Sequence, residues 1–293
     1  MITKQKVKTI DINDGDRLKE LLDTNVTAEI CDNSVGNIFM WKDTLDTETV
    51  GDAPFCIAEH YEGNTYFALR RADGCYIERI KALIGQFGLP LYLCSMTDAE
   101  TEDLKKEFGE RFSFEGEDGA ADYIYDAESL RAFRGKKFHS QKNHMNAFLK
   151  QFSNYTFLPY KSEEERELFA FFDRYEEAVN DMTASAKKES LACRRLIPVL
   201  PKLPVDARVL RLDGEIIGFA VMERICDTLM IHIEKGLPSY RGVYPMLVNL
   251  EANAYPDVKY INREEDDANE GLRRSKESYN PIMLKQKYLG IIE

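Results

Sequence analysis

A run of charged residues follows a short apolar segment near the C-terminus. A run that is typical of a buried strand, 258–262, ends at Asn262. Arg263 follows it, and four acids from Glu264 to Asp267 come next. The predicted helix that comes next carries three basic residues, Arg273, Arg274 and Lys276. Opposite charges this close tune one another's pKa, which suits acid–base chemistry. The spacing taken alone, however, favours a surface ion-pair network that caps the helix and contributes little to stability.

A second charged segment, from Arg131 to Lys150, holds six basic residues and no acidic one. The six are Arg131, Arg134, Lys136, Lys137, Lys142 and Lys150. Lys and Arg donate charge-assisted hydrogen bonds, so this segment suits a partner that bears phosphate. The alternative is a solvated helix with a buried stripe of Phe138, Met145 and Phe148, which leaves Lys137, Gln141 and His144 outside. The two interpretations are evenly balanced.

A loop rich in Gly and Pro, 238–245, lies between a predicted strand and a predicted helix. Free backbone amides at such a helix start can bind a pyrophosphate, and Gly242 permits close approach. The acyl-CoA loop of N-acetyltransferases has the pattern Q/R-x-x-G-x-G/A at this place, of which only Gly242 matches. Coenzyme A would bind here at Arg241, Gly242, Val243 and Tyr244. The alternative is an ordinary turn between a strand and a helix.

The cysteines and histidines do not form a pattern that indicates a metal or a disulfide. The six cysteines, Cys31, Cys56, Cys75, Cys94, Cys193 and Cys226, are scattered without a C-x-x-C pair. The four histidines, His60, His139, His144 and His232, lack the spacing of a ligand pair. In a chain of this size such cysteines are buried thiols. We therefore expect no metal and no metal enzyme.

Composition bounds the class of protein. A chain of 293 residues corresponds to two domains of about 150 residues, or to one large domain. The hydrophobic share of 44% and the charged share of 31% are those of a soluble globular protein. The net charge of −12 argues against a protein that coats nucleic acid or anionic membrane through its overall field. Glycines and Pro90 interrupt the longest uncharged stretch, 82–97, and the first 16 residues have no apolar core, so we expect no membrane span, no signal peptide and a cytoplasmic location.

The second half of the chain has a clear order of elements. Asp213-Gly214 between two apolar runs predicts a hairpin, because both central residues of a type I′ turn need positive φ. The predicted order is three antiparallel strands, helix, strand, helix and strand, over 207–212, 215–225, 228–234, 244–255, 258–262, 269–278 and 283–292. The strands 228–234 and 258–262 should be parallel and joined by a right-handed crossover. The loop before that crossover helix should present free amides.

The first half repeats this order loosely. A hairpin over 55–61 and 65–70 precedes a helix, 77–87, and a strand, 89–95. Thr97 and Glu100 form a capping box that opens a helix over 98–108. Strand-like runs follow at 111–114 and 122–125. The sequence therefore predicts two copies of a mixed α/β unit, with domains 1–128 and 129–293, the second holding the site.

Four segments carry a resemblance to a known family. They are G-N-I-F-M-W (36–41), F-R-G-K-K-F-H-S-Q-K-N-H-M-N-A-F (133–148), Y-I-N-R-E-E-D-D-A-N-E-G-L-R-R-S-K-E-S-Y-N-P (260–281) and K-Q-K-Y (285–288). Together they resemble the family of the phosphatidylglycerol lysyltransferase C-terminal domain, which belongs to the N-acetyltransferase-like superfamily beside the Fem peptidyltransferases. The resemblance implies two tandem acyl-CoA N-acyltransferase (GNAT)-like domains.

The resemblance also implies a function. Members with known activity are similar to aminoacyltransferases that take the aminoacyl group from a charged tRNA. By this likeness Arg263, Glu264 and Asp266 lie at the pocket, and Arg273, Lys276 and Tyr279 face it. Glu264 or Asp266 would take the proton of an attacking amine or hydroxyl, while Lys276 or Tyr279 would meet the charge on the leaving atom. The same likeness implies that Asn262, Arg263 and Arg273 bind substrate, and that Arg134, Lys136, Lys137 and Lys142 meet tRNA phosphates or an anionic acceptor.

Three functional hypotheses remain open at this point. The first is an acyltransferase that uses aminoacyl-tRNA and a small-molecule, peptide or lipid-headgroup acceptor, with no cofactor required. The second is an N-acyltransferase that uses acyl-coenzyme A. The third is a binding module that has kept the fold and lost the chemistry, because fold alone does not imply activity.

Overall fold

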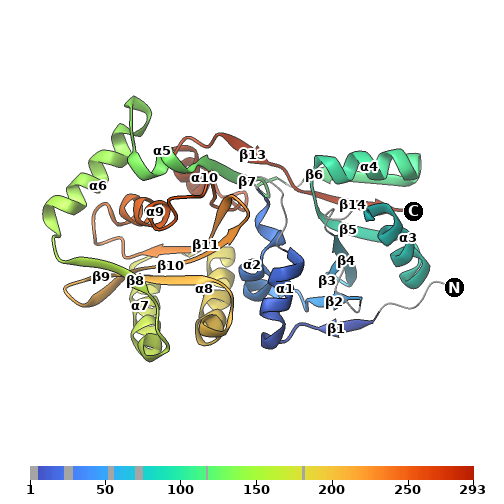
Figure 1. Ribbon diagram of the computed structural model, residues 1–293, viewed down its shortest axis with the longest axis horizontal. Helices are drawn as coiled ribbons and strands as arrows, with labels where there is room; N and C mark the ends of the chain where they lie inside the picture. The colour runs from blue at the N-terminus through green and yellow to red at the C-terminus, as the bar shows by residue number, and fades with distance from the viewer. Residues whose placement is uncertain (1–5, 23–28, 52–55, 70–74, 117, 180–181) are drawn as a thin grey trace.

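The computed structural model describes residues 6–22, 29–51, 56–69, 75–116, 118–179 and 182–293. Two mixed sheets of seven strands each lie side by side in one body (Figure 1). The first sheet has the order β1 (Val7–Thr9), β2 (Glu48–Val50), β3 (Cys56–Tyr61), β4 (Asn64–Leu69), β5 (Leu91–Met96), β14 (Tyr288–Ile292) and β6 (Phe112–Gly116). The second has the order β13 (Met283–Lys285), β7 (Asp122–Asp126), β12 (Tyr260–Asn262), β11 (Thr228–Gly236), β10 (Glu215–Ile225), β9 (Asp206–Leu212) and β8 (Tyr155–Pro159).

Helices cover both sheets. They are α1 (Gly15–Leu22), α2 (Val35–Trp41), α3 (Tyr76–Phe87), α4 (Asp98–Phe108), α5 (Ala127–Ala132), α6 (His139–Gln151), α7 (Glu165–Ala178), α8 (Ala184–Leu196), α9 (Val243–Ala254) and α10 (Glu270–Glu277). Short 3₁₀ turns occupy Ile12–Asp14, Cys31–Asn33, Gly109–Arg111, Lys136–Phe138, Ser162–Glu164 and Ile197–Lys202. No helix in the described ranges is both long and apolar enough to span a bilayer.

Each sheet contains the same local arrangement of a hairpin, a helix and a parallel strand. In the first sheet, β3 and β4 form the hairpin and β4 runs parallel to β5, with α3 between them in the chain. In the second, β10 and β11 are antiparallel and β11 runs parallel to β12, with α9 between them. The hairpin at Asp213-Gly214 has positive φ at both residues, and the capping box of Thr97 and Glu100 is present. These local predictions are confirmed.

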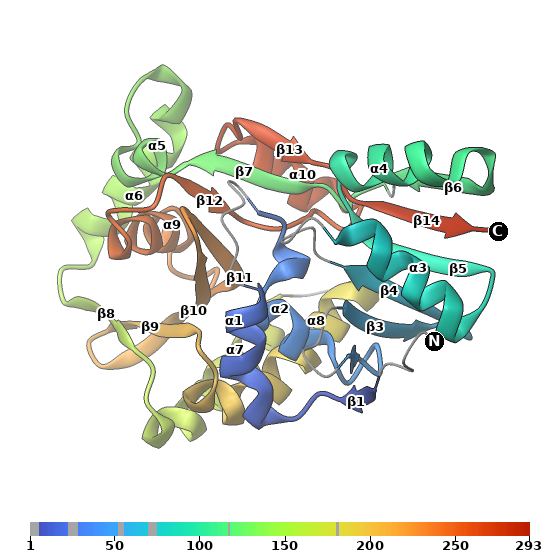
Figure 2. The ribbon, with the colours of Figure 1, turned by 45° about the vertical axis from the view of Figure 1, so that its right-hand side comes forward.

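The two sheets exchange strands. The run 283–292, predicted as one strand, is two: β13 pairs with β7 at the edge of the second sheet, and β14 lies between β5 and β6 of the first. In return β7, which precedes residue 128, lies between β12 and β13 of the second sheet. Figure 2 shows the C-terminal strand crossing to the first sheet. The prediction of one strand was wrong because an apolar run does not reveal which sheet each part of it joins.

The N-terminal helices α1 and α2 also contribute to the core of the second sheet. Leu18, Val35 and Phe39 pack in one cluster with Phe171 and Leu196 of α7 and α8. A second cluster on the opposite side of that sheet includes residues of α5 and α9, and a third belongs to the first sheet with α3 and α4. The division at residues 128 and 129 therefore does not coincide with the sheets and their cores.

Candidate active site

A cavity of about 610 Å³ opens where the parallel pair β11 and β12 separates. The pairing of these strands ends at Met230 and Asn262: β12 stops there, whereas β11 continues to Gly236 without it. The lining of this cavity comes from β11, from the loop after β12 and from α2, α7, α8, α9 and α10. It includes His232, Glu234, Lys235, Arg263, Glu264 and Lys276. Ligands of α/β sheets bind at such carboxyl ends.

Glu264 occupies the loop that leaves β12. Its φ is +58°, and its amide donates to Asn262 Oδ1 at 2.7 Å. The Lys276 ammonium on α10 donates to the carbonyl oxygens of Arg263 and Glu265, one on either side of Glu264. This backbone is therefore held from two directions in a conformation that a side chain otherwise disfavours.

The Glu264 carboxylate accepts a hydrogen bond from His232 on β11. Nδ1 of His232 lies 2.8 Å from Oε1 of Glu264, and Nε2 lies 3.4 Å from Oε2 of Glu223 on β10. The His232 and Glu223 side chains are 0% and 1% exposed, whereas Glu264 is 15% exposed. Burial raises the pKa of Glu264 to about 7, although the hydrogen bond and charge of His232 oppose the rise. Burial alone would lower the pKa of His232, but the two glutamates raise it to about 9.

Glu223 and Gly36 connect this site to α2. Oxygens of Glu223 accept the amides of Val35 and Gly36 at 3.2 and 2.7 Å. Burial favours the neutral form of Glu223, but the neighbouring His232 and the Gly36 amide together lower the pKa of Glu223. A Cβ on Gly36 would lie 2.3 Å from Cδ2 of His232, so only glycine leaves room for the ring.

Arg263 lies in the cavity wall with its charge already paired. One nitrogen of its guanidinium donates to both oxygens of Glu234, at 2.9 and 3.0 Å. The Cζ atom of the guanidinium lies 4.6 Å from the centroid of the Tyr279 ring. Tyr279 is 5% exposed and packs in the core. Burial raises the pKa of the Tyr279 hydroxyl, even though Arg263 opposes the rise. Tyr279 therefore supports Arg263 from beneath and does not line the cavity.

Asp266, Arg273 and Asn262 form contacts outside the cavity. Asp266 accepts from Nε of Arg273 at 2.8 Å and from the Tyr123 hydroxyl at 2.6 Å. Buried Asn262 donates to the Glu29 carbonyl and to Asp122, at 2.9 and 2.7 Å. Of the residues predicted to be catalytic, the cavity brings together Glu264 and Lys276 but not Asp266 or Tyr279.

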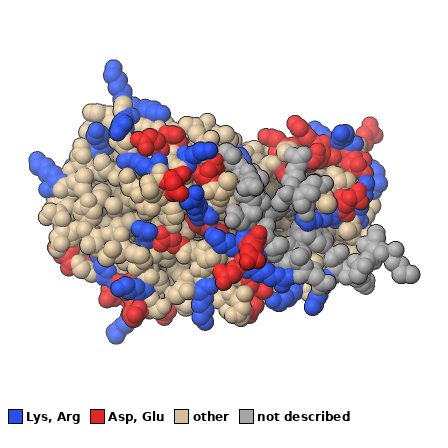
Figure 3. All heavy atoms as spheres, viewed as in Figure 1, with Lys and Arg blue, Asp and Glu red and all other residues tan. Residues whose placement is uncertain are grey.

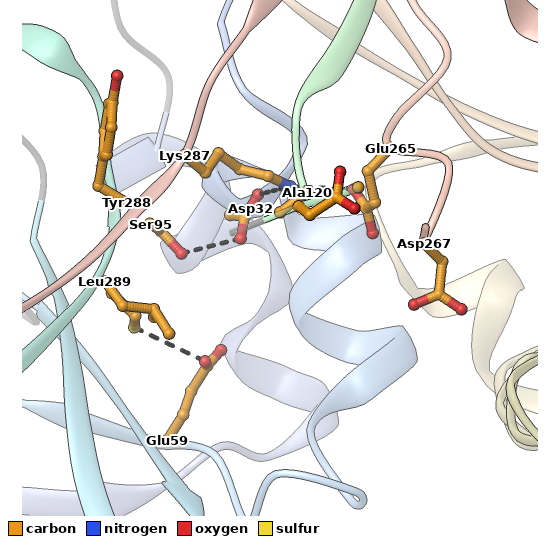
Figure 4. Close-up of a pocket in the computed structure, with 12 residues that line it drawn as sticks. Asp32, Glu59, Ser95, Ala120, Glu265, Asp267, Lys287, Tyr288 and Leu289 are labelled. Carbon is orange, nitrogen blue, oxygen red and sulfur yellow. Dashed lines mark hydrogen bonds and ion pairs between the residues drawn. The ribbon is translucent and has the colours of Figure 1, made fainter. Parts of the chain in front are cut away.

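A smaller cavity of about 250 Å³ lies between the two sheets and shares Glu265 and Asp267 with the first (Figure 4). Lys287, between β13 and β14, places its ammonium 2.7 Å from Asp32, 2.9 Å from Glu265 and 3.1 Å from Asp122. Burial would lower the pKa of Lys287, but these carboxylates raise it well above its ordinary value.

One group of possible metal ligands lies at this lysine. Ligand atoms of Cys31, Asp122 and Glu265 lie within 4.8 Å of one another. The Lys287 ammonium stands among them, 3.5 Å from the Cys31 sulfur. A protein cation thus already occupies the place between these acids.

The loop before α9 is closed by α6. Gly242 has a φ of +87°, and a Cβ there would lie 2.2 Å from the carbonyl oxygen of His144. The amide of Val243 donates to Tyr240 and that of Met246 to Gly242, while Pro245 has no amide hydrogen. The amide of Val243 is therefore not free as expected, because the local turn uses it, and the carbonyl of His144 occupies the space beside Gly242. Of the four residues predicted to bind coenzyme A, Tyr244 alone lines the cavity, whereas Arg241, Gly242 and Val243 do not.

The basic segment forms an exposed surface on α6 and the turn before it. Arg134, Lys136, Lys137 and Lys142 are exposed, and Figure 3 shows Lys and Arg side chains over this end of the molecule. Phe138 and Phe148 are buried and Met145 is partly buried, as the helical stripe predicts.

Two residues of this segment point inward instead. Gln141, expected outside, is buried and donates to Ser278 O at 2.6 Å, because α6 packs against the end of α10. Arg131 donates to the carbonyls of Ala252, Tyr255 and Val258. The basic surface is therefore joined directly to the helix that carries Lys276.

The sequence interpretation missed Glu223, His232 and Gly36. A signal existed, because Glu223 and His232 are polar residues inside apolar strand runs. Their meeting depends on a β-bulge: Ile231 and Ile233 pair with Met222 and Val221, and His232 is the extra residue between them. A bulge re-aims the side chain that it inserts, and no local pattern predicted this one.

Residues 24–291 match the family described as phosphatidylglycerol lysyltransferase, C-terminal. The chain is similar to a conserved protein of unknown function from Bacteroides thetaiotaomicron, with 25% identity, a TM-score of 0.85 and coverage of 99% of this chain and 100% of that one. It is also similar to L-PGS from Bacillus licheniformis, with 15% identity, a TM-score of 0.65 and coverage of 97% of this chain and 92% of that one. A third similar structure is FemX, with 10% identity, a TM-score of 0.61 and coverage of 97% of this chain and 96% of that one. These likenesses confirm the predicted fold class, a mixed α/β protein with GNAT-like architecture.

Proposed function

The chain belongs to the family of the phosphatidylglycerol lysyltransferase C-terminal domain, and from that premise we propose that it transfers an aminoacyl group from aminoacyl-tRNA to an amine or hydroxyl acceptor. The family and the fold support an acyltransferase. The reaction takes place in the cavity where β11 and β12 separate.

One observation carries this proposal: Glu264 is a partly exposed carboxylate in the cavity whose pKa burial raises to about 7. A general base works best when its pKa lies near the operating pH. The other predicted base, Asp266, is paired with Arg273 and its pKa is lowered: burial opposes the fall, but the hydrogen bonds of Arg273 and Tyr123 outweigh it. We therefore assign the role of base to Glu264.

The transfer needs no covalent intermediate on the protein. The acceptor nitrogen or oxygen attacks the ester carbon of the donor, and its proton passes to Glu264. The new bond to carbon forms, the bond to the ribose oxygen breaks, and that oxygen takes the proton back from the Glu264 carboxyl to become a hydroxyl, which regenerates the base. Because an ester is already activated, holding both substrates in one cavity supplies much of the rate.

Lys276 supports the reaction in two ways. Its ammonium has three N–H groups, of which two donate to the carbonyls beside Glu264. The third makes no hydrogen bond with the residues that the structure describes, and it can meet the negative charge that develops on the ester oxygens. Tyr279 lies in the core beneath Arg263 and takes no part in this step.

The choice of tRNA as the donor is supported by the basic surface of α6, since phosphate contacts dominate the affinity for nucleic acid. This surface adjoins α10 through Gln141 and Ser278. Coenzyme A is less well supported, because the His144 carbonyl fills the space beside Gly242 that a pyrophosphate would need.

The test is a transfer assay with labelled aminoacyl-tRNA and a panel of amine, hydroxyl and lipid-headgroup acceptors. Glu264→Gln should lower the rate of transfer by about 10²- to 10⁴-fold, the usual contribution of a general base, while binding of the charged tRNA persists. The matched control is Glu270→Gln on α10, whose side chain is 88% exposed and is not part of the cavity lining, and its rate should stay unchanged.

Two outcomes would contradict the proposal. Transfer from acetyl-coenzyme A but from no charged tRNA would establish the coenzyme A hypothesis. Transfer from tRNA that survives Glu264→Gln unchanged would remove Glu264 as the base.

A further inference from the structure

We propose that His232 and Glu223 form a buried relay that holds the Glu264 carboxylate in its catalytic orientation and ties it to the start of α2. His232 is a positioning residue in this arrangement, since it contacts Glu264 and lies fully buried behind it. The catalytic part of the inference rests on the proposed function, whereas the relay itself does not.

The relay is a row of three ionisable groups from three segments of the second sheet. Glu223 comes from β10, His232 from the bulge in β11, and Glu264 from the loop after β12. The two ring nitrogens of His232 face one carboxylate each, at 3.4 and 2.8 Å. An imidazole with carboxylates at both nitrogens is stabilised as the doubly protonated cation.

The far end of the relay lies in the N-terminal part of the chain. Glu223 accepts the amides of Val35 and Gly36 at the start of α2, so this carboxylate is compensated by two amides and one imidazolium. Since α2 packs in the core of the second sheet, its placement sets the position of Glu223. The N-terminal segment is thus a part of the site, although 228 residues separate Gly36 from Glu264.

The relay requires glycine at position 36, because there is no room for a side chain beside the His232 ring. A Cβ at this position would lie 2.3 Å from Cδ2 and 2.5 Å from Nε2 of His232. Gly36→Ala must therefore displace the imidazole. Gly218 of β10 is a matched control, because the atoms nearest to its Cβ would be those of Leu210 and Leu247, at 3.3 Å, which are not part of the relay.

Other charges also face Glu264. Glu265 and Asp122 of β7 are acids that raise its pKa, and the Lys276 ammonium is a cation beside it. Only His232 donates a hydrogen bond to its carboxylate among the contacts of the described residues. Loss of an adjacent opposite charge raises the pKa of a carboxyl by about one to three units. In His232→Gln, the acidic limb of the pH–rate profile should move to higher pH, and the rate at pH 7 should fall about tenfold or more.

Imidazole NMR tests the relay without any assay of activity. The chain has four histidines, so a histidine-labelled protein gives four ring signals, and His232→Gln identifies one of them. We expect this signal to titrate with a pKa of about 9. Glu223→Gln and Glu264→Gln should each lower that value. Glu48→Gln is the matched control, because Glu48 lies 3.2 Å from His60 and should alter the His60 signal alone.

The outcomes separate the relay from the proposed function. A His232 ring that is neutral at pH 7 in the unmodified protein, or whose titration neither glutamate variant changes, overturns the relay. If Gly36→Ala leaves the His232 signal as unperturbed as Gly218→Ala does, the steric argument is wrong. A relay seen by NMR together with transfer that survives Glu264→Gln would keep the relay and reject the catalytic role of Glu264.

Discussion

At the scale of single residues, residues of three elements hold one acid–base group, the carboxylate of Glu264. His232 supplies a hydrogen bond from β11, Lys276 holds the backbone from α10, and Asn262 at the end of β12 accepts the Glu264 amide. The contacts of His232 and Lys276 are charge-assisted hydrogen bonds, and in a buried setting each contact is worth more than it would be in water. In this buried setting the Glu264 carboxylate gains and loses its proton near neutral pH.

The pH dependence of transfer follows from this carboxylate. Burial raises the pKa of Glu264 from 4.5 to about 7, so the group is protonated at low pH and becomes a base only as the pH rises past that value. The kcat/KM for transfer should therefore rise through about pH 7, after correction for spontaneous ester hydrolysis. A profile that is flat from pH 5 to 8, or one that already levels off near 4.5, would argue against Glu264 as the base.

At the scale of elements, α6 performs two tasks. Its outer face carries the basic residues, and its inner face packs on the start of α9 and on the end of α10. The contact with α9 is so close that it demands glycine at position 242. A glycine that the sequence pattern assigned to a phosphate loop is thus required for the packing of two helices.

Substitution at Gly242 measures this packing. Gly242→Ala combines a left-handed φ of +87° with a Cβ 2.2 Å from backbone, and we expect it to lower the free energy of unfolding by about 2–4 kcal/mol. Gly214→Ala is the control, because Gly214 has a φ of +90° in the open turn between β9 and β10 with nothing within 4 Å of a Cβ. Gly214→Ala should lower the free energy of unfolding by about 1–2 kcal/mol. Equal losses in urea unfolding would show that the His144 contact is unimportant.

At the scale of the whole molecule, the two sheets are joined by strands that cross between them. β7 and β14 each complete the sheet formed mainly by the other half of the chain. Lys287 lies on one of these crossings and is the cation shared by Asp32, Asp122 and Glu265. Because neither sheet is complete without the exchanged strand, we expect both to unfold in one cooperative transition.

Removal of the shared cation should be costly. Lys287→Met removes the cation shared by buried Asp122 and the partly buried Asp32 and Glu265, and should lower the free energy of unfolding at pH 7 by about 3–5 kcal/mol. The loss should shrink at lower pH, where those carboxylates take up protons. Lys259→Met is the control, because that lysine is 74% exposed and 3.6 Å from Asp227, and should change stability by less than about 1 kcal/mol. A Lys287→Met protein as stable as the control would refute the role of Lys287.

The sequence alone determined the elements that depend on near neighbours. The hairpin at Asp213-Gly214 and the capping box at Thr97 follow from residues within a few positions of one another. The parallel crossover through α9 follows from the order of strand, helix and strand along one continuous segment. The motif from Tyr260 to Pro281 also located the loop that carries Glu264. Local backbone preferences and periodicity act over such short distances, which is why these predictions are confirmed.

Only the tertiary structure decided which side chains meet. Glu223 and His232 are conspicuous in the sequence as polar residues inside apolar runs, but no local pattern indicates that they meet each other and Gly36, because their contact depends on a bulge and on the packing of α2 against the second sheet. The exchange of β7 and β14 was equally hidden, since a strand's edges accept any partner with the right hydrogen-bond register. Contacts between distant segments are determined by how the whole core is buried, and a local sequence pattern does not predict them.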